Sequence, residues 1–358
     1  MVEAGFSRFV AAQVYRWIYV QQERDIDLWS NVSKKCKEYL KKHFRFDLPK
    51  VIFHALSVDG TRKFLVQFDD GQTVETVVIP SHNRLTQCIS SQVGCAIGCT
   101  FCHTGTQGLK RNLQTSEIVG QYMAITQWLK ENVHPDERLT NIVYMGQGEP
   151  LHNYERVKEA TKVFLEPKGL GLSQRKVTLS TSGLVPKIKM LHDFPPVNIA
   201  ISLHAASNDK RTELMPINKA YDLERLFGAI KEIPLKAHRR ITYEYLLIAG
   251  MNDGEEDVQA LVRLLNKKES KVNLIPFNEY PGGKYKRPSP KKTIWFMEEL
   301  NRRGLVCTIR ATKGDDILAA CGQLKSEYEK LNLWDQSVEI SISNNEFQSQ
   351  NSHRPQLS

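Results

Sequence analysis

Four cysteines lie within sixteen residues, and their spacing limits the kinds of site that this chain can form. The stretch from Cys88 to His103 reads CISSQVGCAIGCTFCH, with Cys95, Cys99 and Cys102 forming a C-x3-C-x2-C triplet. Three thiolates at this spacing can wrap one face of a cubane iron–sulfur cluster and leave its fourth iron open to an exchangeable ligand. Closed clusters and structural zinc sites use four protein ligands. The triplet therefore favours a metal centre with one open position.

Two other interpretations of these residues stay open at this point. Cys99-Thr-Phe-Cys102-His103 matches the C-x-x-C-H pattern of haem attachment, and three cysteines with one histidine can also bind zinc. Covalent haem attachment usually requires export. The first twenty residues contain an early acidic residue and no small-residue cleavage site, so we expect no signal peptide and a cytoplasmic protein. The interpretation of these residues as a haem-attachment site is therefore disfavoured, whereas a zinc site stays open.

Composition narrows the class of protein. A chain of 358 residues that is 41% hydrophobic can bury one large core beside a smaller domain. No apolar run reaches the roughly 20 residues needed to cross a bilayer, so we expect no membrane segment. Seven cysteines in a protein that is not exported are expected to serve metal or redox chemistry. The net charge of +9 favours nucleic acid as a partner, although attraction to a membrane surface would produce the same bias.

Residues 1–80 are predicted to form a small basic α+β module that binds RNA. Apolar residues recur at helical spacing over residues 6–20, and a lysine-rich helix is expected over residues 31–45. The first fifty residues hold ten Lys and Arg against six Asp and Glu, so about four of the nine net charges lie here. Such a helix is commonly just a solvated face, but it can also hold phosphates. Three alternating strands follow, separated by Asp-Gly hairpin turns: 51–58, 63–68 and 72–79.

Residues 81–325 are predicted to form the catalytic domain, in which strands and helices alternate. The expected strands are 87–91, 141–145, 176–180, 197–203, 241–247 and 272–276, and the expected helices are 116–130, 154–164, 223–231, 255–265 and 291–302. Ser116 and Asp222 fit helix starts. This alternation predicts parallel strands in a partial, six-stranded (β/α) TIM-like barrel, with a doubly wound sheet as the alternative. Residues 326–358 are expected to be a polar, mobile tail.

Polar loops follow the predicted strands, where sites gather in both architectures. The second strand runs into Gly146-Gln147-Gly148-Glu149-Pro150, in which glycine lets the backbone approach a ligand and Glu149 can accept from an ammonium group. The third and fourth strands end in STSG and SLH. Cys321 lies between alanines and a glycine, which would leave its thiol accessible, whereas Cys36 and Cys307 (the latter in an apolar, strand-like run) are assigned to structure.

Together these motifs resemble the radical S-adenosylmethionine (radical SAM) superfamily and, within it, the adenine-C2 RNA methyltransferases of the RlmN type. The resemblance covers roughly residues 10 to 325. It rests on CISSQVGCAIGCTFCHTGTQGLKRNL, MGQGEPLHN, STSGLVP, SLHAASNDKRTELMPIN, NLIPFNEYPG and TKGDDILAACGQL. The sister family, Cfr, methylates adenine at C8 and has Ala where this chain has Pro150, so Pro150 favours the RlmN type. Three residues, Gln147, His152 and Leu318, depart from the pattern of the RlmN type and put fine substrate contacts in doubt.

The resemblance implies a role for individual residues. Cys95, Cys99 and Cys102 would hold a [4Fe–4S] cluster, and S-adenosylmethionine would chelate its open iron. Cys321 would carry a methyl group, Cys88 would resolve the intermediate by forming a disulfide, and Glu75 would accept a proton. The implied contacts of S-adenosylmethionine are Gly148, Glu149, Ser180, Ser202, Leu203, His204 and Asn278.

The chemistry explains why two cysteines are needed besides the cluster ligands. The C2 carbon of adenine lies between two ring nitrogens and is electron-poor, so it cannot attack a methyl sulfonium. A thiolate can. A methyl group carried on Cys321, once turned into a carbon radical, can add to C2, and Cys88 can then release the product. The resemblance also implies partners: 23S rRNA, the anticodon arm of tRNA and an external electron donor. The reactive base must be unstacked. A Cfr-like C8 methyltransferase and a zinc-containing RNA-binding protein remain the alternatives.

Overall fold

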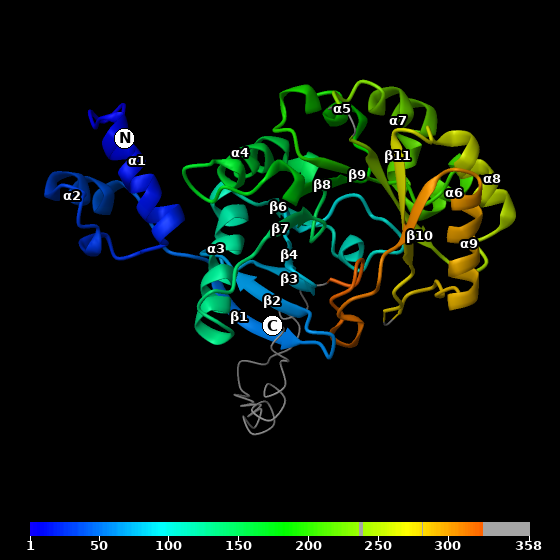
Figure 1. Cartoon of the computed structure of the whole chain (residues 1–358), viewed down its shortest axis with the longest axis horizontal. Helices are drawn as coiled ribbons and strands as arrows, with labels where there is room; N and C mark the ends of the chain where they lie inside the picture. The colour runs from blue at the N-terminus through cyan, green and yellow to red at the C-terminus, as the bar shows by residue number, and fades with distance from the viewer. Residues whose placement is uncertain (236–238, 281, 325–358) are drawn as a thin grey trace, which may run out of the picture. The chain divides into compact units, whose positions relative to one another are not determined.

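The computed structural model of the chain describes residues 1–235, 239–280 and 282–324 (Figure 1). The tail predicted for residues 326–358 lies outside the described residues. The described strands are β1 (Lys50–Leu56), β2 (Arg62–Gln67), β3 (Thr73–Ser81), β4 (Arg84–Cys88), β5 (Gln92–Gly94), β6 (Leu109–Asn112), β7 (Asn141–Tyr144), β8 (Val177–Thr181), β9 (Asn198–Ser202), β10 (Ile241–Leu247), β11 (Ser270–Pro276) and β12 (Val306–Ile309). The described α-helices are α1 (Arg8–Arg16), α2 (Lys34–His43), α3 (Thr115–Asn132), α4 (Tyr154–Leu165), α5 (Val185–Ile188), α6 (Asn208–Leu214), α7 (Leu223–Ile230), α8 (Glu255–Leu264) and α9 (Pro290–Arg302).

One sheet of ten strands organises the fold, in the order β1-β2-β3-β4-β7-β8-β9-β10-β11-β12. In this order, neighbouring strands from β1 to β4 are antiparallel. Neighbouring strands of the same sheet from β4 through β7 to β12 are parallel. Helices connect the successive parallel strands, and α3 packs beside α4 and α8 beside α9 (Figure 1). The predicted module boundary at residue 80 falls inside β3, so strands on both sides of it share one sheet.

The predicted fold class, a partial TIM-like barrel of α/β type, is confirmed. All six predicted parallel strands are present, as β4 and β7 to β11. A seventh parallel strand, β12, pairs with β11 and is not among the six predicted strands. This strand has four residues, of which only Cys307 is buried, so its apolar signal is weak.

One of the two predicted helix starts is correct. The Asp222 carboxylate accepts the Arg225 N–H at 2.9 Å and caps α7. Ser116 does not start α3, because the helix begins at Thr115 and its N-cap is Gln114. The Gln114 N–H donates to the Glu117 carboxylate at 2.7 Å. A glutamate that closes a capping box lies three residues after the N-cap, so Glu117 points to residue 114.

The hydrophobic core fills the space between the sheet and its helices. Strand β10 is buried at six of its seven residues, as expected of a parallel strand covered on both faces, whereas the edge strand β1 has no fully buried residue. Among the described residues, no helix has both the length and the apolar character needed to span a bilayer.

The two N-terminal helices share a small core of their own. Trp29 is fully buried at its centre, stacks on Trp17 with ring centroids 6.1 Å apart and meets Phe46 edge-on at 5.4 Å. Cys36 and Leu40 on the inner face of α2 complete it, so Cys36 is structural, as expected. Among the described residues, the buried Trp29 indole N–H has no hydrogen-bond partner.

We expect Trp29→Ala to lower the stability of this helical pair by about 3–5 kcal/mol, because it empties the centre of a small core. Trp29→Phe is the matched control: it keeps an aromatic ring, removes an unpaired N–H and should cost less than about 1.5 kcal/mol. Native-state hydrogen exchange of residues 8–43 measures both. Equal loss of protection in the two variants would show that the pair is not held by this ring.

Candidate active site

A cavity of about 160 Å³ opens at the C-terminal ends of the parallel strands. The residues that line it lie near the C-terminal ends of successive strands. They are Met145 after β7, Ser180 to Ser182 at β8, Ser202 and His204 at β9, Leu246 in β10, Ile275 in β11 and Arg310 after β12. This is the end of the sheet at which parallel α/β folds bind ligands. The cavity therefore lies at the edge of the sheet where the polar loops of the sequence predict a site.

The cysteine triplet forms one end of this cavity. Cys95, Cys99 and Cys102 all line it, on a loop closed at its base by the short β5–β6 ribbon. The Cys95 N–H donates to the Gly108 carbonyl at 2.9 Å, and the Cys102 N–H donates to the Cys99 carbonyl at 3.1 Å. The sequence between the two strands is therefore folded back so that three thiols face one space.

Burial raises the pKa of each thiol of the triplet, and neighbouring thiols raise the pKa of Cys99 further. The three side chains are thus close enough to repel one another when ionised. Iron binding removes this penalty because each metal ligand is a thiolate, so binding must release protons. In the described part of the chain, no three Cys, His, Asp or Glu side chains are arranged around a single metal ion. Three thiols facing one space fit a cubane, whose ligands each bind a different iron.

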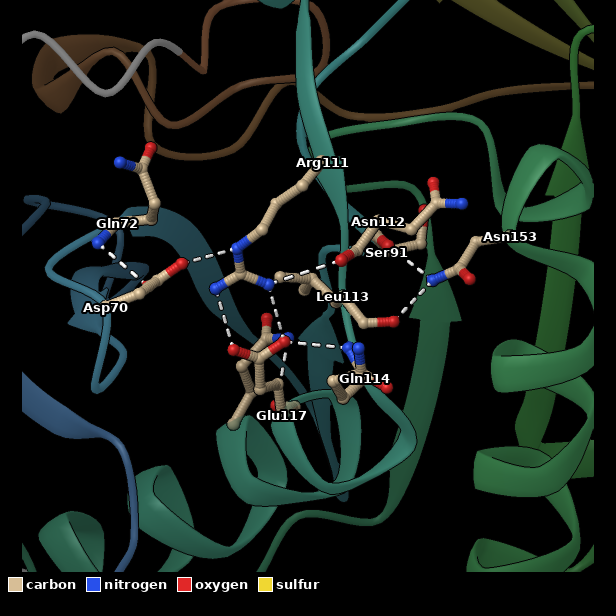
Figure 2. Close-up of polar contacts among 10 residues, drawn as sticks. Asp70, Gln72, Ser91, Arg111, Asn112, Leu113, Gln114, Glu117 and Asn153 are labelled. Carbon is tan, nitrogen blue, oxygen red and sulfur yellow. Dashed lines mark hydrogen bonds and ion pairs between the residues drawn. The ribbon is translucent and has the colours of Figure 1, made fainter.

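An ion-pair network holds the ribbon that carries the triplet (Figure 2). Arg111 on β6 donates through Nε to Asp70 at 2.6 Å and through both Nη atoms to Glu117 at 2.8 Å. Asp70 belongs to the β2–β3 turn and Glu117 to the first turn of α3. A forked guanidinium between two carboxylates fixes orientation as well as distance. Two separate elements, the β2–β3 turn and α3, are thereby tied to the strand that leaves the triplet.

The loop after β7 closes over the triplet. The Glu149 N–H donates to the Gln92 side chain at 2.8 Å, and the Glu149 carboxylate accepts from the Leu151 N–H at 3.0 Å and from the Ser182 N–H and hydroxyl at 2.7 Å. Gly148 has a φ of +95°, and a Cβ there would lie 2.5 Å from the Gln92 Cβ. Glycine is therefore required for this loop to pack on β5.

Five of the seven residues predicted to contact S-adenosylmethionine line this cavity. Ser180, Ser202 and His204 line the cavity, together with Gly148 and Glu149. Burial lowers the pKa of His204 to about 3, with a further contribution from the Arg211 guanidinium. The His204 Nδ1 accepts the Leu246 N–H at 3.0 Å, so the neutral ring carries its proton on Nε2. Leu203 is fully buried and is not among the described residues that line the cavity.

Cys321 lies where this cavity meets a second one of about 410 Å³. Met145, Ile275, Arg310 and Cys321 line both. Cys88 lines the second cavity, and its pKa is raised to about 12 by burial and by the neighbouring Cys321. The structure therefore brings the two predicted relay cysteines together, with Cys321 also facing the triplet.

Two further predicted site residues, Asn278 and Glu75, lie outside the cavity of the cysteine triplet. Asn278 lines the second cavity, and its side-chain amide donates to the Cys321 carbonyl at 3.3 Å and accepts from the Thr312 hydroxyl at 3.1 Å. Glu75 lies on β3 with its carboxylate 3.2 Å from the Lys63 ammonium. Among the described residues that line either cavity, Glu75 is not included.

Sequence reasoning gave no role to Arg211, whose side chain braces the cavity. The guanidinium is fully buried and donates to the carbonyls of Ser182 at 2.8 Å, Ser202 at 3.3 Å and Leu203 at 3.3 Å, and to the Asn218 side chain at 2.8 Å. In the sequence, Arg211 lies within a short polar helix. Because a charged residue of such a helix usually faces solvent, the sequence did not indicate that this arginine is buried.

Arg310 and Glu244 were missed as well. The pKa of Arg310 is raised by nearby Cys321, with Glu244 and Cys88 contributing, so the guanidinium stays protonated at the junction of the cavities. Burial raises the pKa of Glu244, which accepts from the Asn273 side chain at 2.7 Å. Glu244 lies in the middle of β10 and Arg310 directly follows β12, and sequence pattern there cannot tell a buried charge from a solvated one.

Comparison with known proteins agrees with these features. Residues 89–265 match the radical SAM superfamily, and residues 1–45 match the ribosomal RNA large subunit methyltransferase N-terminal domain. The dual-specificity RNA methyltransferase RlmN of Paracoccus denitrificans (strain Pd 1222) is 43% identical over 341 residues, covering 92% of this chain and 87% of that protein. RlmN of Gluconobacter oxydans (strain 621H) is 44% identical over 337 residues, covering 92% and 83%. The crystal structure of a radical SAM methyltransferase from Sphaerobacter thermophilus matches with a TM-score of 0.83 and 38% identity, covering 91% of this chain and 95% of that one.

We expect Arg211→Met to lower the free energy of unfolding by about 3 kcal/mol, because it strands several buried acceptors. It should also weaken S-adenosylmethionine binding at least tenfold, since the loops after β8 and β9 lose their shared anchor. Urea unfolding and equilibrium dialysis of the reconstituted protein measure the two effects. Arg225→Met, an exposed arginine on α7, is the matched control and should change neither. Unchanged binding in Arg211→Met would contradict the bracing role.

Proposed function

The chain belongs to the RlmN family of radical SAM RNA methyltransferases, which use a [4Fe–4S] cluster and S-adenosylmethionine, and from this we propose that it methylates C2 of adenosine in 23S rRNA and in tRNA through an S-methylcysteine relay. The observation that carries the proposal is the position of Cys321, which lines both the cavity of the triplet and the cavity of Cys88. A methyl carrier must reach a donor on one side and an acceptor on the other.

We assign the first cavity to the cluster and to S-adenosylmethionine. Cys95, Cys99 and Cys102 would hold the cluster, which when reduced supplies the electron that splits S-adenosylmethionine. The rim after β7, β8 and β9 offers Glu149, Ser180 and Ser202 to a ligand that carries an ammonium, a carboxylate and hydroxyls. The neutral His204 ring can only donate through Nε2 toward a ligand there. Leu203 and Asn278 act indirectly in this proposal, Asn278 by holding the backbone of Cys321.

Cys321 and Cys88 carry the group transfer. The Cys321 thiolate takes a methyl group from one S-adenosylmethionine, and hydrogen abstraction leaves a carbon radical on the sulfur-bound methyl. That carbon bonds to C2 of the adenine. One electron passes to an acceptor, a role that the oxidised cluster would fill, and the C2 proton passes to a base. The Cys88 sulfur then attacks the Cys321 sulfur, and the sulfur–carbon bond breaks with its electron pair on the methylene carbon. That carbon takes up a proton, so methyladenosine leaves behind a Cys88–Cys321 disulfide. An external electron donor must then reduce the disulfide to two thiols.

The burial of Cys88 bears on its attack on the Cys321 sulfur. With a pKa near 12, its thiol is neutral at physiological pH and must lose its proton as it attacks. The Arg310 guanidinium, which lines the same cavity, favours the thiolate that forms. The C2 proton of adenine also needs an acceptor, and Glu75 is the carboxylate we propose for its removal.

RNA binding is assigned to the second cavity and to the basic helix α2. Lys34, Lys35 and Lys42 are exposed on this helix, whereas Lys41 is paired with Asp27 at 2.6 Å. Exposed ammonium groups can displace the counterions of phosphates. We place the reaction in the cytoplasm, whose reducing pool keeps cysteines as thiols, and the seven cysteines here are all free.

We expect Cys321→Ala to abolish methyladenosine formation, whereas Cys88→Ala should accumulate protein covalently linked to RNA, because only release is blocked. Anaerobic incubation with RNA, a reductant and methyl-labelled S-adenosylmethionine, followed by nucleoside mass spectrometry and denaturing gels, measures both outcomes. Cys307→Ala, at a buried cysteine that is not among the described residues lining either cavity, is the matched control. Product from Cys321→Ala would refute the relay, and 8-methyladenosine would move the chain to the C8 chemistry of Cfr.

We expect replacement of Lys34, Lys35 and Lys42 by Gln to weaken RNA binding and to reduce the slope of log K against log salt by about 2. Cleavage of S-adenosylmethionine without RNA should not change. Filter binding at several salt concentrations gives the slope. Lys219, Lys267 and Lys268, exposed on other elements, provide a control of equal charge. An equal effect in the control would assign the loss to net charge rather than to α2.

A further inference from the structure

The segment that carries Cys321 has little regular structure of its own. We define the Cys321 loop as residues 313–323. Three of its residues have positive φ: Gly314 at 68°, Leu318 at 52° and Gly322 at 84°. Leu318 is not a glycine, so its conformation costs free energy and must be held by its surroundings. What holds this loop decides where the Cys321 sulfur lies.

A distant hairpin turn supplies the main anchors. We define the β1–β2 turn as residues 57–61, some 250 positions earlier in the chain. The Asp316 carboxylate accepts the Ser57 hydroxyl at 2.6 Å and the Val58 N–H at 3.1 Å. Together these contacts lower the pKa of Asp316, so the bonded form is the carboxylate. Both oxygens of one side chain are thereby committed to the turn.

A second aspartate makes the reciprocal contact. The Asp59 carboxylate of the turn accepts the Thr61 N–H at 2.9 Å and the Gly314 N–H of the loop at 3.1 Å. A Cβ on Gly314 would lie 2.9 Å from the Thr61 side chain, so loop and turn are in close contact there. Further along, the Lys63 ammonium donates to the Leu318 carbonyl at 3.4 Å. The loop is thus bonded to the β1–β2 hairpin at three of its positions.

We propose that Asp316 and Asp59 are positioning residues that fix the Cys321 loop to the β1–β2 turn and so keep the Cys321 sulfur at the junction of the two cavities, within reach of Cys88. The proposal rests on the role of Cys321 as methyl carrier. Charged hydrogen bonds to a rigid hairpin replace the ladder bonds that an irregular loop lacks. Holding two sulfurs near each other raises their effective concentration, and a displacement of about 1 Å can cost two orders of magnitude in rate.

The first test measures the pair of sulfurs without the methylation reaction. The reconstituted protein is equilibrated anaerobically with glutathione buffers. One glutathione disulfide oxidises the two thiols to the Cys88–Cys321 disulfide and leaves as two glutathione thiols. Mass spectrometry of the linked peptides gives the equilibrium constant. Asp316→Ala should lower it at least tenfold, equivalent to about 30 mV. Asp316→Asn, which keeps one acceptor oxygen, should have a smaller effect.

The second test measures coupling. With RNA and S-adenosylmethionine supplied, Asp316→Ala should form severalfold more 5′-deoxyadenosine per methyladenosine than the wild type, because the methyl group is less often in place when the radical forms. A role in stability alone would lower both products together. Asp136→Ala, at a side chain that is 95% exposed, is the matched control and should match the wild type in both tests.

Cluster content and unfolding are measured on the same samples. If Asp316→Ala does not fold or loses iron, Ser57→Ala and Asp59→Asn each remove a smaller part of the contact and should each lower the constant about threefold. Values within a factor of two of the wild type in all foldable variants would overturn the proposal. Failure of the relay itself is distinct, because the wild type would then form no 2-methyladenosine.

Discussion

Two hydrogen bonds between segments more than 200 residues apart bring the reactive groups of this enzyme together. The His103 N–H donates to the Gly322 carbonyl at 2.7 Å, and the Thr104 hydroxyl donates to the Leu324 carbonyl at 2.5 Å. They join the end of the cysteine triplet to the loop that carries Cys321. They thereby link the segment that follows β4, near one end of the parallel run of strands, to the segment that follows β12 at its other end.

The charges around this junction are costly to bury, and the fold compensates for each in a different way. Arg211 is satisfied by carbonyl oxygens at the ends of β8 and β9, so its cost is offset by hydrogen bonds that also shape the cavity. Arg310 instead faces thiols and Glu244. The Arg310 guanidinium lowers the pKa of Cys88 and so favours the thiolate, which is the form the proposed relay needs when Cys88 attacks. One buried arginine therefore serves the architecture and the other the chemistry.

Local sequence patterns predicted most of the scaffold, because they act over a few residues. Strand–helix alternation located β4 and β7 to β11, and the spacing of the cysteine triplet located the metal-binding loop. What the sequence could not give are contacts set by tertiary packing. Arg211 looks like a surface residue of a polar helix start, and Asp316 looks like part of a solvated turn. Asp59-Gly60 was recognised as a hairpin turn, but nothing in its letters shows that the turn would receive the Cys321 loop.

Glu75 illustrates how the same geometry constrains the proposed mechanism. Its carboxylate is paired with Lys63, whose ammonium also bonds to the Leu318 carbonyl of the Cys321 loop. The carboxylate that we propose for removal of the C2 proton is thus linked through one lysine to the Cys321 loop. Since Glu75 does not line either cavity among the described residues, a proton must reach it through an intervening group or after a shift of Lys63.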